Sequence, residues 1–297
     1  MGVEQREGGG LYFKHGQRRF FVEVYRWIKY RRKGMMRVLT WLFLILFILP
    51  LSGAVARKLD NHAFGVGEKL RFALRYGPIR AGTGVMQVKG IEIVDGRPTY
   101  HVVSTTRTNE IFSLFFKVRD RIESFIDVEG IFPRRFEKYI REGKYRSRTT
   151  VFYDQENGLA LTSDDTTRVP PYVQDFISSL YFIRTQNLKV GESIFLDIFQ
   201  GDKIYPLEVK ILRRERVKVD AGTFDCLVVE LVTKGTGLFF KKGGTLVVWL
   251  TDDERKMPVL MKSKVKIGSI SAELVRYSLG SFDHQKTTGN TKGQGSS

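Results

Sequence analysis

The segment KLRFALRYGP, residues 69–78, decides the fold class. Leu70, Phe72 and Leu74 occupy every second position, with arginine at positions 71 and 75, which is the pattern of a strand with one buried face. Turn sequences recur at short intervals along the chain: Tyr76-Gly77-Pro78, Asp95-Gly96, Glu129-Gly130, Glu142-Gly143, Asn157-Gly158, Gly201-Asp202 and Ala221-Gly222. Residues 64–280 are therefore predicted to form a mainly β domain, an antiparallel meander curled into a barrel or half-barrel.

One segment near residues 172–186 departs from this pattern and predicts an α-helix packed against the sheet. At 100° per residue its apolar side chains share one face: Phe176, Ile177, Leu180, Tyr181 and Ile183. Arg184 falls near the middle of that face, and a buried guanidinium needs a partner. The candidate protein partners are Asp252, Asp253, Glu192 and Glu123. The alternatives are a set of carbonyl oxygens, or an anionic ligand contacting Arg184 and Tyr181.

The N-terminal region predicts export from the cytoplasm. Residues 35–56, MMRVLTWLFLILFILPLSGAVA, carry no charge from Val38 onward and end in the small-residue pattern Ala54-Val55-Ala56. This layout is typical of a signal peptide cleaved after Ala56, and an uncleaved inner-membrane anchor is the alternative. Residues 1–34 form a basic extension, or lie upstream of a true start at Met35 or Met36. Residues 57–63 are expected to be a linker, and residues 281–297 a disordered polar tail. The domain is therefore expected in the periplasm.

Charge and cysteine content exclude several classes of function. The formal net charge is +17, and outside the cytoplasm its polyanionic partners are lipid head groups, lipopolysaccharide or acidic glycans rather than nucleic acid. The single cysteine, Cys226, excludes an internal disulfide framework and a Cys-rich metal cage. No nucleophile elbow, P-loop or zinc-protease motif occurs, so no cofactor or metal is expected. His101 is the one histidine within the β region and is interpreted as an ordinary strand residue.

Two short repeats favour binding of something apolar. Leu114-Phe115-Phe116-Lys117 recurs as Leu238-Phe239-Phe240-Lys241. Consecutive strand side chains point to opposite faces, so one phenylalanine of each pair meets a second layer, a ligand or a membrane. Plain core packing is the alternative. A basic hairpin nearby supplies candidate anion-binding residues, namely Arg135, Lys138, Arg146 and Arg148.

A series of short elements gives the chain a family resemblance. They are Phe64-Gly-Val-Gly-Glu68-Lys-Leu70, Gly82-Thr-Gly84, Asp120-Arg121-Ile-Glu-Ser124, Pro133, Asp175-x-x-Ser178-x-x-Tyr181-x-x-Arg184, Gly191-Glu192, Gly222-Thr-Phe224 and Trp249-Leu-Thr-Asp-Asp253-x-x-x-x-Pro258-Val259. In this order they resemble the bacterial domain of unknown function 3108. The resemblance covers essentially the whole predicted exported region and implies a β-rich envelope protein with no established activity. The hairpin at residues 249–259 is also similar to one in the lipoprotein-carrier superfamily, whose half-barrels hold acyl chains.

Three functional hypotheses follow from these patterns. The first is a non-catalytic periplasmic protein that binds an amphiphilic or anionic envelope component, such as a lipid, a lipoprotein, lipopolysaccharide or an acidic glycan, with a membrane surface as a further partner. The second is a hydrolase of envelope glycan or lipid that uses the carboxylates of Asp252 and Asp253. The third is a structural partner in an envelope assembly. An apolar cavity would favour the first hypothesis, and converging carboxylates in a cleft would favour the second.

Overall fold

The computed structural model describes residues 57–233, 246–264 and 269–281. These residues form one antiparallel sheet of 14 strands, with neighbours in the order β8-β7-β6-β5-β4-β3-β2-β1-β14-β13-β12-β11-β10-β9. The strands are β1 (Lys69–Tyr76), β2 (Ile79–Val94), β3 (Arg97–Thr108), β4 (Arg119–Asp127), β5 (Pro133–Glu142), β6 (Tyr145–Asp154), β7 (Leu159–Leu161), β8 (Thr166–Arg168), β9 (Ser193–Gln200), β10 (Lys203–Val219), β11 (Gly222–Thr233), β12 (Leu246–Thr251), β13 (Pro258–Lys264) and β14 (Ser269–Ser278).

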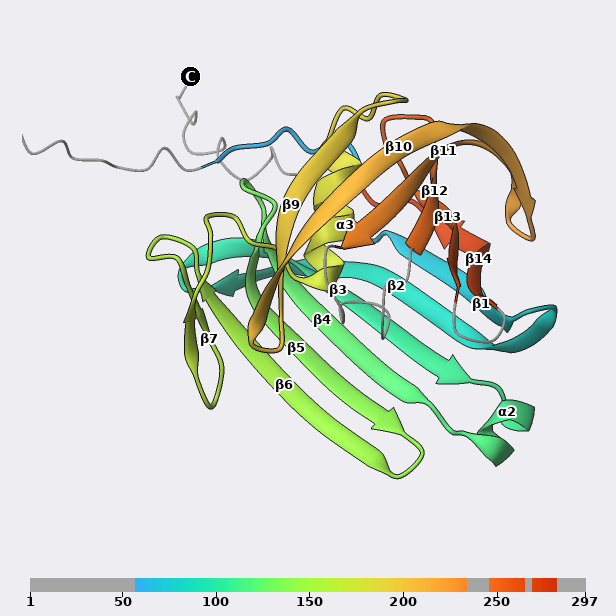
Figure 1. The fold of residues 1–297 in the computed structure, drawn as a ribbon, viewed down its shortest axis with the longest axis horizontal. Coiled ribbons are helices and arrows are strands. Elements are labelled where there is room, and N and C mark those ends of the chain that lie inside the picture. The colour runs from blue at the N-terminus through green and yellow to red at the C-terminus, as the bar shows by residue number, and fades with distance from the viewer. Residues whose placement is uncertain (1–56, 234–245, 265–268, 282–297) are drawn as a thin grey trace, which may run out of the picture. The chain divides into compact units, whose positions relative to one another are not determined.

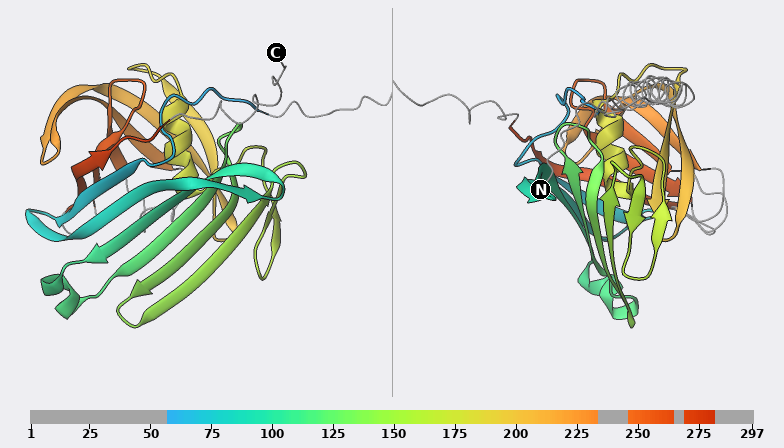
Figure 2. Two further views of the ribbon diagram at one scale, coloured as in Figure 1. Left: turned by 180° about the vertical axis from the view of Figure 1, so that it is seen from behind. Right: turned by 90° about the vertical axis from the view of Figure 1, so that its left-hand side faces the viewer.

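The strands form two meanders, β1–β8 and β9–β14, in each of which strands consecutive in the chain pair with one another. In the β2–β3 turn, Asp95 and Gly96 have φ angles of 49° and 72°, the left-handed backbone that two-residue hairpin turns of this twist require. Pairing of β14 with β1 joins the second meander to the first. Strands β8 and β9 remain the edges, so the described sheet curls without closing (Figures 1 and 2). The prediction of a mainly β, curled antiparallel meander is confirmed, in its unclosed form.

Helix α3 (Phe176–Thr185) packs against the sheet, as predicted, but begins four residues later than the expected segment. Tyr172 has a left-handed φ of 60°, and Gln174 forms a bridge with Ile198 of β9, so the residues before the helix are not helical. Asp175 caps the helix, because its Oδ1 accepts hydrogen bonds from the backbone N–H groups of Ile177 (2.6 Å) and Ser178 (2.8 Å). The Ser178 hydroxyl completes the capping box.

The helix lies inside the curl of the sheet and contacts β4 and β9 (Figure 1). Ile177 and Tyr181 belong to one apolar core with residues of β1–β4 and β11–β14. Ile183 belongs to a second core with residues of β9–β12. Phe176 and Leu180, which were expected on the buried face, are only half-buried. One side of the helix therefore faces space within the curl.

A second helix, α2 (Glu110–Phe115), was not predicted. It connects β3 to β4 and has no buried residue. Asn109 caps it, since the Asn109 side-chain oxygen accepts a hydrogen bond from the backbone N–H of Phe112 at 2.9 Å. The segment around Phe115 and Phe116 was expected to be a strand, and the cap explains why the chain turns here instead.

The predicted signal peptide or anchor at residues 35–56 lies outside the described residues, as do Phe239, Phe240 and residues 282–297. Within the described ranges, no helix has the length and apolar character needed to cross a bilayer. Residues 57–63, predicted to be a linker, contact the domain. The Arg57 guanidinium donates hydrogen bonds to the carbonyl oxygens of Gly130 (2.8 Å) and Ile131 (3.0 Å), and Ala63 is fully buried.

Candidate functional site

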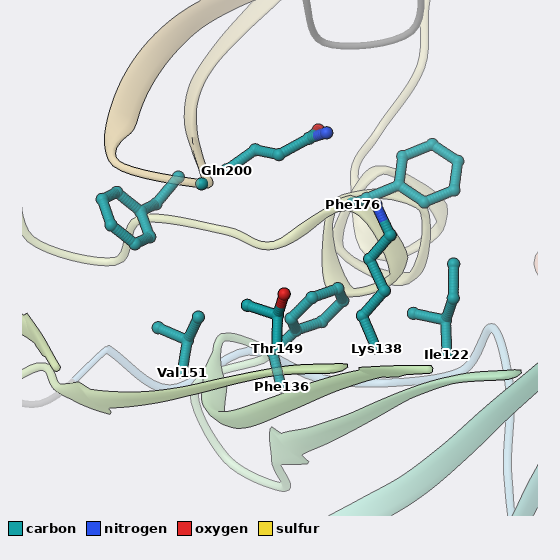
Figure 3. A pocket seen from close by; sticks show the side chains of 9 residues that line it. Ile122, Phe136, Lys138, Thr149, Val151, Phe176 and Gln200 are labelled. Carbon is teal, nitrogen blue, oxygen red and sulfur yellow. The ribbon is translucent and has the colours of Figure 1, made fainter. Parts of the chain in front are cut away.

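A pocket of about 340 Å³ lies between the inner face of β4–β6, helix α3 and the β9–β10 turn (Figure 3). The residues lining it are Ile122, Phe136, Lys138, Thr149, Val151, Phe176, Phe199, Gln200 and Gly201. Strand register explains why they converge: Phe136 stands opposite Val151 and Lys138 opposite Thr149, so these four side chains point to the same face. The pocket volume lies within the range of ordinary ligand sites.

The wall of this pocket is mostly apolar, with few polar groups. In Figure 3 the Lys138 and Thr149 side chains rise from the sheet on the same side as Val151 and Ile122. Lys138 forms no ion pair within the described residues, although its positive charge lowers the pKa of the half-buried carboxyl of Glu142. Burial and the nearby carboxylate of Asp120 act more strongly in the opposite direction and leave the pKa of Glu142 above its usual value. An apolar pocket with one cationic side chain suits a molecule with an apolar body and an anionic group.

A second pocket, of about 140 Å³, lies on the other side of Phe176. Its apolar lining includes Phe72, Leu74, Val85, Met86, Phe176, Ile177, Leu180, Leu231, Leu246, Val248, Met261 and Ala272. Phe176 lines both pockets, so the first turn of α3 separates them. The half-buried face of the helix is thus the partition between two apolar spaces.

Arg184 is fully buried and its side chain forms an ion pair with Glu68, which corrects the predicted set of partners. The Nη1 and Nη2 atoms of Arg184 donate to the two carboxylate oxygens of Glu68 at 2.8 and 2.7 Å. Nη2 also donates to the carbonyl oxygen of Ala63 at 2.9 Å, and Nε to that of Arg255 at 3.1 Å. Burial lowers the pKa of Arg184, but the Glu68 carboxylate raises this pKa by more than burial lowers it. The pKa of Arg184 is therefore above its usual value. None of the four predicted carboxylates forms an ion pair with Arg184. Glu68, just before β1, takes that position, and Asp253 contributes only through its charge.

Tyr181 and Arg184 line neither pocket. The Tyr181 ring is fully buried and packs edge-to-face on Phe64, with ring centroids 4.6 Å apart. The Arg184 guanidinium carbon lies 5.2 Å from the centroid of the Tyr181 ring. These two side chains attach the last turn of the helix to the segment preceding β1, so their geometry is that of a structural anchor.

The structure divides the four candidate anion-binding residues between the two faces of the sheet. Lys138 faces the first pocket. Arg135, Arg146 and Arg148 stand opposite Phe152, Arg141 and Tyr139, which puts them on the other, convex face. The guanidinium carbon of Arg135 lies 3.7 Å from the ring centroid of Phe125, and that of Arg148 lies 5.1 Å from the ring centroid of Tyr139.

Asp252 and Asp253, the proposed hydrolase pair, lie between β12 and β13, where their carboxylates accept hydrogen bonds from neighbouring groups. Asp253 Oδ1 accepts hydrogen bonds from the Thr251 hydroxyl and from the backbone N–H groups of Arg255 and Lys256, at 2.6, 3.0 and 3.0 Å. Asp252 Oδ2 accepts from Arg214 Nε at 2.6 Å. Neither lines the two apolar pockets. Among the described residues, no group of His, Cys, Asp or Glu side chains has the arrangement of a metal site.

Sequence reasoning missed most of the pocket. Phe136, Val151, Phe199 and Gln200 were not singled out, because nothing in the sequence distinguishes a strand residue that meets a cavity from one that meets a helix. His101 was interpreted as an ordinary strand residue, yet its Nε2 and Nδ1 lie 2.6 and 2.7 Å from carboxylate oxygens of Glu123 and Glu92. Register with β2 and β4 determines that contact.

The curled antiparallel sheet around an internal helix defines a β-barrel-like protein with apolar pockets. A family model described as a protein of unknown function, DUF3108, matches residues 71–275, and the chain belongs to this family. The predicted family is therefore confirmed. No curated protein matches the chain.

Solved structures are similar in fold. A β-barrel-like protein of the domain of unknown function DUF1849 from Brucella abortus has a TM-score of 0.51 at 12% identity, covering 74% of this chain and 100% of that one. A candidate lipoprotein from Parabacteroides distasonis has a TM-score of 0.35 at 11% identity, covering 75% of this chain and 99% of that one. At such low identity the first likeness shows the fold alone, and the second is too distant to add to it.

Proposed function

We propose that this protein binds an amphiphilic molecule of the bacterial envelope, a lipid or the acyl chain of a lipoprotein, in the pocket between β4–β6 and α3, and catalyses no reaction. The segment at residues 35–56, uncharged from Val38 onward, supports an envelope location. The observation that carries the proposal is the apolar pocket of about 340 Å³ with Lys138 in its wall. An acyl chain in such a pocket gains about 0.8 kcal/mol for each buried methylene.

The role of Lys138 is to select an anionic head group. Its side chain reaches into a mostly apolar space, where a charge is attracted to an opposite charge more strongly than in water. The Gln200 amide lies across the pocket and offers a further hydrogen-bonding group (Figure 3). A carboxylate or phosphate is the chemistry that both groups accommodate.

Two adjacent threonines of β6 provide a matched test. Thr149 lines the pocket, whereas Thr150 stands opposite Glu137 on the convex face, and both are half-buried. The protein is titrated with cis-parinaric acid, a fluorescent fatty acid, and saturable binding is expected. Thr149→Trp fills part of the pocket and should weaken binding by tenfold or more. A tenfold loss is about 1.4 kcal/mol, which is roughly the free energy of burying two methylene groups of the acyl chain. Thr150→Trp should bind like the parent.

The charge preference is tested with Lys138→Met. This change should weaken binding of the fatty acid by about tenfold, the contribution of a charge-assisted hydrogen bond, and leave the matching fatty alcohol unaffected. Arg148→Met, on the convex face, is the control. Equal affinities for the two tryptophan variants, or an absence of saturable binding, would contradict the proposal.

A further inference from the structure

Several large apolar side chains are exposed together where β3 passes into β4 and β5 into β6. Helix α2 exposes 68% of Ile111, 84% of Leu114 and 85% of Phe115. Phe116, which follows the helix, is 53% exposed, and Tyr145 at the β5–β6 turn is 61% exposed. These five residues are called the α2 tip. Exposed apolar residues are ordinary when scattered, but a group of this size marks an interaction surface.

The two parts of the α2 tip form one surface. The Gly143 N–H, in the β5–β6 turn, donates a hydrogen bond to the carbonyl oxygen of Lys117 at 2.8 Å, and Val118 bridges to Glu142. The Phe116 ring lies against Gly143, where a Cβ atom would be 3.2 Å from the ring. Figure 1 shows α2 and the β5–β6 turn at the same end of the sheet.

The α2 tip is held in place despite its exposure. Besides the Asn109 cap, the Asn109 amide donates a hydrogen bond to the carbonyl oxygen of Arg80 at 2.7 Å. The hydroxyl oxygens of Thr108 and Ser113 are 2.9 Å apart, within hydrogen-bonding distance. These polar contacts fix a helix that buries none of its residues. Specific hydrogen bonds therefore hold a group of apolar side chains in an exposed position.

Basic side chains surround the α2 tip. Residues 107–121 and 139–148 together contain eight Lys or Arg and three acidic residues. Of these cations, only Arg121 forms an ion pair within the described residues, with Glu123. The other seven cations form none: Arg107, Lys117, Arg119, Arg141, Lys144, Arg146 and Arg148. A hollow of about 500 Å³ on the convex face beside the tip is lined by Arg107, Arg119, Arg121 and Arg141, together with Asp120 and Glu123. The acids reduce the positive charge without cancelling it.

We propose that the α2 tip docks on a lipid bilayer that contains anionic lipids. Exposed aromatic and aliphatic side chains next to Lys and Arg that form no ion pair match the two layers of a membrane interface, acyl chains below and anionic head groups above. The proposal goes beyond ligand binding and does not depend on it. Strands β4, β5 and β6, which line the first pocket, run on to this end of the sheet (Figure 1).

A local probe tests the proposal in the full chain, because it reports the tip itself and not other membrane-binding segments. Leu114→Cys is labelled with an environment-sensitive NBD dye, which Cys226 escapes because it is fully buried. Vesicles of phosphatidylglycerol and phosphatidylcholine in equal parts should shift the NBD emission to the blue, and pure phosphatidylcholine should not. Phe195→Cys, on β9 and 73% exposed, is the matched control and should show no shift.

Charge reversal separates the electrostatic contribution. Lys144→Glu and Arg146→Glu together should weaken vesicle affinity, read at the labelled Leu114→Cys, by about 25-fold or more, since each cation near an anionic surface contributes a factor of about five. Lys203→Glu, at the first residue of β10, should leave it unchanged. An equal shift with neutral vesicles, or a shift produced only by added envelope protein, would overturn the proposal. Binding of cis-parinaric acid to the same variants should be unchanged, so failure of one proposal is distinguishable from failure of the other.

Discussion

Replacing Arg184 by methionine would test how the helix is attached to the sheet. The substitution keeps an apolar stem but removes both hydrogen bonds to the Glu68 carboxylate, which is 0% exposed. It also leaves the carbonyl oxygens of Ala63 and Arg255 without the donor that residue 184 supplied. Breaking a buried ion pair from one side costs about 3–5 kcal/mol, because the remaining charge stays desolvated. Native domains have only about 5–15 kcal/mol of stability.

Urea unfolding provides the assay. With a slope of roughly 2–3 kcal/mol per molar urea for a domain of this size, Arg184→Met should lower the midpoint by about 1–2.5 M. Glu68→Met should have a similar effect, and the double variant should recover part of the loss, since no buried charge then remains. The matched control is Arg216→Met. Arg216 contacts Asp225 with the same two-point geometry, at 2.7 and 2.8 Å, but both side chains are exposed, so the midpoint should hardly move.

The reasoning fails if Arg184→Met changes the midpoint no more than Arg216→Met does. It also fails if the double variant is destabilised by the sum of the two single changes. That result would mean that Arg184 and Glu68 contribute separately and that the ion pair does not hold the helix.

Two further predictions concern buried groups. Burial raises the pKa of the Asp175 carboxyl to about 6, so between pH 4 and 6 the native state retains a proton that the unfolded chain has released. The free energy of unfolding should therefore fall by about 3 kcal/mol across this window relative to Asp175→Asn, in urea melts at each pH; equal slopes for the two proteins would contradict this. Burial raises the pKa of the Cys226 thiol to about 12, so it should react with Ellman's reagent only as fast as the protein unfolds, and rapid reaction under native conditions would refute the burial.

Alternation along each strand was sufficient to predict the sheet. Leu70 and Phe72 are 0% and 2% exposed, while Arg71 between them is exposed. Period two determines which side chains face inward, and the turn residues determine where each strand ends. Neither signal specifies whether the last strand meets the first. The unclosed sheet, with β8 and β9 as its edges, therefore had to come from the structure.

The candidate site was less predictable, because it depends on contacts between distant parts of the chain. Glu68 and Arg184 are 116 residues apart. Lys138 was identified from a run of basic residues, but the same run contains Arg135 and Arg148, which face the opposite side. Only the register of β5 against β6, and the position of α3 above them, separates a pocket residue from a surface residue. The sequence shows which residues are charged, but the strand register is needed to know which face of the sheet each of them is on.

Helix α3 is fixed at both ends by buried polar contacts, and this explains how apolar pockets persist beside it. At its start, Asp175 Oδ2 accepts a hydrogen bond from the Ser124 hydroxyl of β4 at 2.6 Å. At its end, Arg184 holds Glu68. Apolar contacts are non-directional, and a helix held only by them would shift until its side chains closed the empty space. Polar contacts have fixed lengths. The helix therefore stands at a set distance from β4, and Phe176 is left half-buried between two pockets.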